Sequence, residues 1–163
     1  MLKKAIVVKP QWAEPHYNYG RLLKKQGDRE GVLKELQLAT QLAPAVHLYY
    51  ADSLLAAGKL AEASSEYERS VSLGPSLKAE QRLADIYIRT GNRSGAEAIL
   101  RRVIAESPYD GSSHLSMARL LEQDGRFSEA LSEYGKVLET NPQSSEAQSA
   151  ITRLQKYQGK PKG

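Results

Sequence analysis

The 163-residue chain contains no cysteine. It can therefore form no disulfide, no thiolate zinc site and no cysteine nucleophile. No stretch approaches the roughly 18 apolar residues that span a membrane, and residues 1–10 lack the apolar core of a signal peptide. We expect a soluble protein without membrane insertion, and the sequence leaves its compartment, cytoplasmic or periplasmic, open.

The body of the chain also lacks an excess of basic residues, although the net charge is +4 and the isoelectric point about 9.2. Residues 1–12 and residues 143–163 each carry a net charge of +3, whereas residues 13–142 hold 16 basic and 18 acidic side chains. A nucleic-acid-binding protein carries a basic stripe on its folded body. The charge distribution therefore predicts no nucleic-acid partner.

Glycine and proline are sparse but regularly spaced. Prolines at positions 10, 44, 75, 108 and 142 are 34, 31, 33 and 34 residues apart, and glycines at 27, 58, 91 and 125 each precede a proline by 17 residues. Three sets of packing positions keep the same offsets from the glycines: Gly20, Ala51, Ala84 and Ala118; Val32, Ala63, Ala96 and Ala130; Leu36, Tyr67, Leu100 and Tyr134. The chain therefore contains four copies of an internal repeat.

Each repeat has the pattern of two amphipathic helices. Small or apolar residues recur at i, i+3, i+4 and i+7, which is the helical period. The glycine ends the first helix, because a residue just past the last turn often needs a positive φ. The proline ends the second helix, because it cannot donate to the helix and disfavours helical geometry in the residue before it.

These features resemble the tetratricopeptide repeat (TPR), whose pattern is W-x2-L-G-x2-Y, then A-x3-F, then P. The fourth copy matches with Met117, Ala118, Leu121, Ala130, Tyr134 and Pro142. The tryptophan position departs from the pattern and holds His16, His47, Glu80 and His114. The resemblance implies an all-α fold, an α-solenoid (right-handed superhelix) of helix–turn–helix units with a C-terminal capping helix.

The repeat register predicts the boundaries along the chain. Residues 1–12 match the end of a second helix, so we expect a chain that begins inside a repeat, with Leu2, Ala5 and Ile6 exposed. Apolar residues on one face of residues 144–157 predict a cap with a polar outer side. The expected segments are a remnant helix at 1–12, repeats at 13–43, 44–76, 77–110 and 111–143, a capping helix at 144–158 and a flexible tail at 159–163.

The sequence offers no convincing catalytic or metal site. His16, His47 and His114 occupy equivalent positions in separate repeats, too far apart for one zinc ion, so we interpret them as packing residues. Ser113 and His114 are adjacent on a helix and point about 100° apart, which prevents a nucleophile–base pair. Acidic pairs such as Glu66 with Glu68, or Glu122 with Asp124, lack an apolar pocket. We predict no enzyme, cofactor or metal.

The resemblance implies that the second, fifth, ninth and twelfth positions of each first helix line a concave groove that binds partner peptides. We call these positions the first-helix face. Five of its side chains are apolar where packing does not require it, namely Tyr17, Leu48, Leu55, Ile88 and Leu115. The predicted partner-binding residues are Tyr17, Arg21, Lys24, Leu48, Asp52, Leu55, Gln81, Asp85, Ile88, Leu115, Arg119 and Glu122.

The sequence therefore favours a non-catalytic scaffold that binds a protein or peptide partner. Two alternatives stay open: self-assembly through the incomplete first repeat, and an accessory domain of a larger enzyme. The lysine and asparagine pattern with which some family members clamp a chaperone's C-terminal carboxylate is matched only by Asn18, Lys24 and Lys25. The partner thus remains open.

Overall fold

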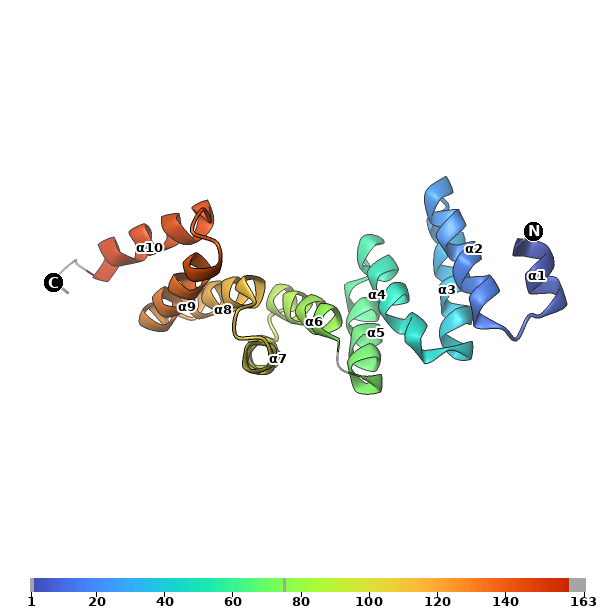
Figure 1. Ribbon diagram of the computed structural model, residues 1–163, viewed down its shortest axis with the longest axis horizontal. Helices are drawn as coiled ribbons and strands as arrows, with labels where there is room; N and C mark the ends of the chain where they lie inside the picture. Colours follow the sequence, from blue (N-terminus) through green and yellow to red (C-terminus); the bar gives the residue numbers. More distant parts are fainter. Residues whose placement is uncertain (1, 75, 159–163) are drawn as a thin grey trace. The chain divides into compact units, whose positions relative to one another are not determined.

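The computed structural model describes residues 2–74 and 76–158, and within these it contains only helices and turns, with no strand (Figure 1). The predicted all-α fold is thus confirmed. The chain divides into two compact units, Met1–Ala79 and Glu80–Gly163. The division falls inside a helix of the third repeat, and each unit is described by itself.

The first unit, hereafter unit 1, contains two helix pairs. Helix α2 packs along α3, α4 packs along α5, and α1 contacts α2. Their bounds are α1 Leu2–Val8, α2 Ala13–Gln26, α3 Arg29–Leu42, a 3₁₀ helix η1 Pro44–Val46, α4 His47–Ala56 and α5 Leu60–Leu73.

The second unit, unit 2, contains the third and fourth pairs and the last helix. Helix α8 packs along α9 and contacts α7, and α10 packs on α9. The bounds are α6 Leu77–Thr90, whose first residues belong to unit 1, then α7 Arg93–Glu106, α8 Gly111–Gln123, α9 Phe127–Thr140 and α10 Ser145–Gln158. None of these helices, nor any other in the described residues, has the length and apolarity needed to cross a membrane.

The helix ends follow the glycine and proline positions. The four repeat glycines, at 27, 58, 91 and 125, have φ angles between 74° and 81°, a region that only glycine adopts without strain. The residues before Pro44, Pro108 and Pro142 have φ angles of −147°, −135° and −139°. Proline disfavours helical geometry in the preceding residue, so each second helix ends there.

The repeat prolines Pro44 and Pro75 are only 31 residues apart, and the structural cause of this short spacing lies at the start of the second repeat. Helix α4 has 10 residues, whereas α2 has 14. The turn η1 replaces the missing first helical residues, and its Val46 is buried. The second repeat therefore keeps its packing with a shorter first helix.

The core of each unit is formed by the positions that recur with the repeat. Ala51 in unit 1 and Ala84 and Ala118 in unit 2 have no exposed surface, which lets neighbouring helices approach closely. The larger residues Tyr67 and Tyr134 are also at most 1% exposed and fill the adjacent space. The predicted packing positions are confirmed.

The two ends differ in what they bury. In α10, Ala147, Ala150 and Leu154 are buried in the core of unit 2. In α1, Ile6 is half-buried, as is Ala5, so the expectation that both would be exposed is wrong: the exposed apolar residues are Val7 and Val8. The side chain of Leu2 and the predicted tail at 159–163 lie outside the described residues.

Asp110 caps the N-terminus of α8. Its carboxylate accepts hydrogen bonds from the Ser113 backbone N–H at 2.9 Å and from the Gln81 amide at 2.7 Å. Burial opposes ionisation of Asp110, but the hydrogen bonds from Ser113, Gln81 and Ser112 outweigh it and hold the pKa of Asp110 below its ordinary value.

We expect Asp110→Ala to lower the free energy of unfolding by about 1 kcal/mol at neutral pH, the usual effect of removing a cap. Because the pKa is lowered in the folded state, this stabilisation is present above the ordinary value of 3.8 and is lost as the pH falls through the folded-state pKa. Urea unfolding from pH 7 downwards measures it: the curves of the parent and the variant should converge in acid. Asp110→Asn keeps an acceptor, so an equally large loss in that variant would contradict the capping role.

Candidate functional site

Three of the four repeats contain a largely buried histidine–glutamate pair between their two helices. His16 Nδ1 lies 2.7 Å from Glu35 Oε2, and the corresponding distances are 2.6 Å for His47 with Glu66 and 2.6 Å for His114 with Glu133. In each pair the two residues are 19 apart in sequence. The pairs join the first helix of a repeat to its second.

Two of the histidines also contact a backbone carbonyl. Nε2 of His16 lies 3.0 Å from Pro10 O, and Nε2 of His114 lies 2.9 Å from Pro108 O. Both ring nitrogens of His16 and of His114 therefore have a hydrogen-bond partner. His47 follows the shortened junction before α4, and its ring forms no hydrogen bond with a backbone carbonyl of the described residues.

These contacts correct the interpretation of the histidines as packing residues only. Each one also contacts a largely buried carboxylate, and in the third repeat Glu80 takes the histidine position and pairs with Arg102 at 2.9 Å. In the described residues no group of three or more histidine, aspartate or glutamate side chains could hold a metal ion.

The first-helix face of unit 1 combines aromatic and positively charged side chains. The rings of Tyr17 and Tyr49 lie 4.9 Å apart between centroids, and the Arg21 guanidinium lies 5.7 Å from the Tyr17 centroid. Burial and the hydrogen bond with Tyr49 raise the pKa of Tyr17. Asp52 accepts from the Tyr67 hydroxyl at 2.6 Å and from Lys78 Nζ at 2.5 Å.

Two charged side chains on the first-helix face of unit 2, Arg119 and Glu122, form ion pairs within the unit. Arg119 donates twice to Glu146, both at 2.6 Å, and these hydrogen bonds lower the pKa of Glu146. Glu122 accepts from the Tyr134 hydroxyl at 2.8 Å and from Arg153 at 2.6 Å. Desolvation and the bond to Glu122 raise the pKa of Tyr134.

The remaining predicted site residues divide between packing and surface. Ile88 and Leu115 are half-buried against the core of unit 2, which corrects the expectation that the fold does not use them. Asp85 is largely exposed by surface area, yet desolvation still raises its pKa. Leu48 and Leu55, in unit 1, are also half-buried, and Gln81 donates to Asp110.

Arg21 and Lys24 contrast with Arg119 and Glu122, which occupy the same two repeat positions. Both of the unit 1 side chains are exposed, and neither forms an ion pair or hydrogen bond with a described residue. The first-helix face of unit 1 thus keeps two positive charges that its own residues leave uncompensated.

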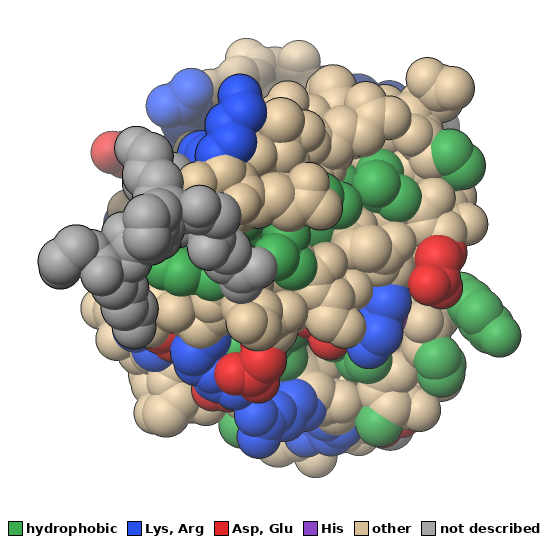
Figure 2. Space-filling view, turned by 90° about the vertical axis from the view of Figure 1, so that its left-hand side faces the viewer, with side chains coloured by type: hydrophobic (Ala, Val, Ile, Leu, Met, Phe, Trp, Pro, Cys, Tyr) green, Lys and Arg blue, Asp and Glu red, His purple; other side chains and the backbone are tan. Residues whose placement is uncertain are grey.

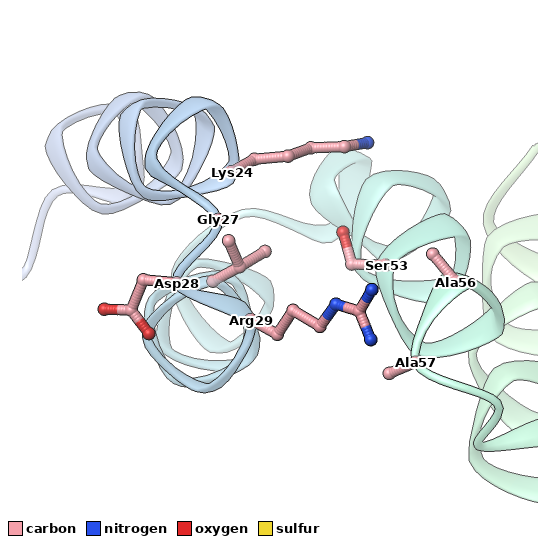
Figure 3. A pocket seen from close by; sticks show the side chains of 8 residues that line it. Lys24, Gly27, Asp28, Arg29, Ser53, Ala56 and Ala57 are labelled. Atoms are coloured by element: carbon pink, nitrogen blue, oxygen red, sulfur yellow. The ribbon is translucent and has the colours of Figure 1, made fainter.

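A hollow of about 290 Å³ lies at the end of this face, between α2–α3 and α4 (Figure 3). The side chains of Lys24 and Arg29 extend towards α4 from either side, whereas Asp28 points away. The lining residues used below are Lys24, Arg29, Val32, Ser53, Ala56 and Ala57, and we call this site the α2–α4 hollow.

The sequence pattern did not indicate Arg29, Ser53 and Tyr49 as site residues. The groove positions were taken from first helices only, whereas Arg29 begins a second helix. Aligning the repeats on their glycines would have revealed the small residues at 53 and 57, where the fourth repeat has Leu120 and Asp124.

The visible surface carries charges of both signs. On the face drawn in Figure 2, lysine and arginine side chains lie beside aspartate and glutamate side chains, with hydrophobic side chains scattered among them. This mixed surface is typical of soluble proteins and does not itself mark a site.

Comparisons with known proteins agree with the repeat pattern. Family models described as tetratricopeptide repeat match residues 44–69, 78–108 and 94–154. The chain is 34% identical over 111 residues to DnaJ homolog subfamily C member 3 of Rattus norvegicus, covering 68% of this chain and 22% of that protein. The Gallus gallus protein of the same name is 32% identical over 136 residues, covering 82% and 25%. The chain thus spans a quarter or less of these relatives.

Solved structures share the fold at low identity. YrrB, a TPR protein with an unusual peptide-binding site, matches with a TM-score of 0.81 and 20% identity, covering 97% of this chain and 84% of YrrB. MamA matches with a TM-score of 0.84 and 17% identity, covering 90% and 82%. With the helix pairs and the repeated glycines, prolines and small residues, these matches show that the chain belongs to the tetratricopeptide-repeat family.

Proposed function

We propose that this chain is a non-catalytic scaffold that binds a segment of a partner protein on the first-helix face of unit 1. TPR proteins are protein-interaction scaffolds in general, and a peptide-binding site is described for YrrB. The observation that carries the proposal is the uncompensated positive charge of Arg21 and Lys24 beside the rings of Tyr17 and Tyr49.

This surface suits a segment with acidic and apolar side chains. Aromatic residues supply large contact areas with little loss of conformational freedom, and arginine is enriched at the centres of interfaces. The exposed cations attract acidic segments and orient them before contact. The other predicted binding residues, Leu48, Asp52 and Leu55 in unit 1 and the six in unit 2, extend the proposed surface within their own units.

The histidines also support the proposal that the chain is not catalytic. In His16 and His114 both ring nitrogens are already hydrogen-bonded within the protein, so neither ring is placed to exchange a proton with a substrate. No nucleic-acid partner is proposed, because the positive charge of unit 1 lies among tyrosines rather than along a basic stripe.

The test begins by recovering a partner from the source cell with this chain as bait and identifying it. The purified partner is then titrated against the parent chain and its variants. Arg21→Glu combined with Lys24→Glu should weaken binding about tenfold at low salt and less at high salt, because the exposed charges are screened. Helicity should stay unchanged, since both side chains are exposed.

The matched control is Lys4→Glu combined with Lys34→Glu, which makes the same change in net charge at two exposed lysines outside the first-helix face. If the control weakens binding as much as the face variant does, the effect is one of net charge and the proposed surface is wrong.

Self-assembly is the second candidate, favoured by Val7 and Val8, which are 81% and 73% exposed on α1. Light scattering over a range of concentrations separates the two. A mass that rises with concentration in the parent, and falls back in a variant with Val7→Ser and Val8→Ser, would favour self-assembly over partner binding.

A further inference from the structure

The α2–α4 hollow of unit 1 has a direct counterpart in unit 2 that is filled. Aligning Gly27 with Gly91 and Gly58 with Gly125 places Lys24 with Ile88, Arg29 with Arg93, Ser53 with Leu120 and Ala57 with Asp124. The backbones agree at the decisive position: φ and ψ are −85° and −1° at Ala57, and −84° and 0° at Asp124. The two sites can therefore be compared side chain by side chain.

In unit 2 the chain fills this place with its own residues. Leu120 is 1% exposed in the core, and Asp124 forms an ion pair with Arg93. Leu120 on α8 and Asp124, the residue that caps the end of this helix, thus place an apolar group and a carboxylate at the positions that correspond to Ser53 and Ala57.

In unit 1 both of these groups are missing while the arginine remains. Ser53 and Ala57 replace the leucine and the aspartate, and a hollow of about 290 Å³ takes their place. Arg29 has no hydrogen bond or ion pair with a described residue, and Lys24 adds a second positive charge where unit 2 has Ile88. Figure 3 shows both cations reaching across the hollow towards α4.

We infer that the α2–α4 hollow binds a branched aliphatic side chain together with an adjacent aspartate or glutamate carboxylate, both presented by the partner segment. The aliphatic group would contact Val32, Ala56 and Ala57, and the carboxylate would pair with Arg29 and Lys24. This inference rests on the proposed function and names the side chains that the face of unit 1 selects.

Size and charge both favour this occupant. Ligand pockets for whole small molecules start at about 300 Å³, so the hollow suits one or two side chains. A charged pair in a partly enclosed site benefits from reduced screening, and arginine can bind a carboxylate with two parallel hydrogen bonds. The apolar lining by valine and alanine distinguishes this site from a purely electrostatic patch, which would accept any anion.

The probe is the blocked dipeptide N-acetyl-Leu-Asp-amide, titrated to 50 mM against the isotope-labelled chain and followed by nuclear magnetic resonance. We expect saturable shifts at Gly27, Arg29, Ser53 and Ala57. The matched probes N-acetyl-Leu-Asn-amide and N-acetyl-Ala-Asp-amide remove the charge or the branched group, and each should bind at least about fivefold more weakly. Equal binding of the three dipeptides, or no saturable shift at these residues, would overturn the inference.

A variant that rebuilds the unit 2 arrangement gives an independent readout. Ser53→Leu with Ala57→Asp should fill the hollow, pair with Arg29, raise the melting temperature and abolish dipeptide binding. Arg29→Gln should reduce dipeptide binding about tenfold without changing the melting temperature, because its side chain is exposed. Undiminished binding in both variants would place the dipeptide elsewhere.

The two proposals fail separately. If the natural partner depends on Arg21 and Lys24 but binds the Ser53→Leu, Ala57→Asp variant normally, then the α2–α4 hollow is not used and the proposed function stands. If the dipeptide binds the hollow but the partner ignores the Arg21→Glu, Lys24→Glu variant, then the proposed function is wrong and the hollow is a separate site.

Discussion

Replacing His114 by phenylalanine should lower the free energy of unfolding by about 3 kcal/mol, in the range found when a buried charged or polar group loses its partner. His114 is 1% exposed, and its ring nitrogens hydrogen-bond with Glu133 at 2.6 Å and with Pro108 O at 2.9 Å. Phenylalanine fills a similar volume but donates nothing, so the glutamate and the carbonyl both lose a partner. Urea unfolding at neutral pH measures the loss.

Two controls separate lost pairing from poor packing. His114→Phe combined with Glu133→Met removes both members of the pair, and most of the stability should return. His47→Phe should cost about 1 kcal/mol, because Glu66 keeps its bond with Arg69 at 3.0 Å and no carbonyl contact is lost. If the single and the double variants at 114 are equally unstable, then the size of phenylalanine is the cause.

Leu120→Ala should lower the free energy of unfolding by about 3 kcal/mol, within the usual range for a buried leucine. Leu120 is 1% exposed in the core of unit 2, where the equivalent position of unit 1 carries a serine and a hollow. The expected loss contains the transfer energy of the removed carbons and the cost of the cavity left behind. Chemical denaturation measures it.

Leu115→Ala is the matched comparison on the same helix, because Leu115 is only half-buried. It should cost clearly less than Leu120→Ala. An equal loss would mean that α8 depends on its leucines through helix packing in general, and that position 120 is not a specific filler of the space between repeats.

The all-α fold and the helix ends could be predicted because their causes are local. A glycine with positive φ and a proline after an extended residue each act within a few residues, so their spacing alone gives four helix pairs. Packing positions such as Ala118 and Tyr134 recur with the same period and could be assigned without knowing their neighbours.

Side-chain pairing could not be predicted in the same way. His16 and Glu35 are 19 residues apart, and nothing in either helix alone shows that they meet across the repeat. The groove positions came from the family resemblance and the helical period, which give the direction of the Ile88 and Leu115 side chains but not how deeply the core of unit 2 buries them. The sequence also could not predict which cations lack an ion-pair partner, because this depends on which side chains the fold brings close to each cation.

The histidine–glutamate pairs have a consequence for how such a chain can grow. Donor and acceptor lie in one repeat, as in His114 and Glu133, so a duplicated repeat carries a complete buried pair into its new place. Contacts between repeats behave differently: Arg126 reaches back to Glu97 at 2.7 Å, and a copy inserted between them must supply a matching partner on each side. A duplicated repeat therefore keeps its buried histidine–glutamate pair, whereas the ion pairs between repeats must be selected anew at every insertion.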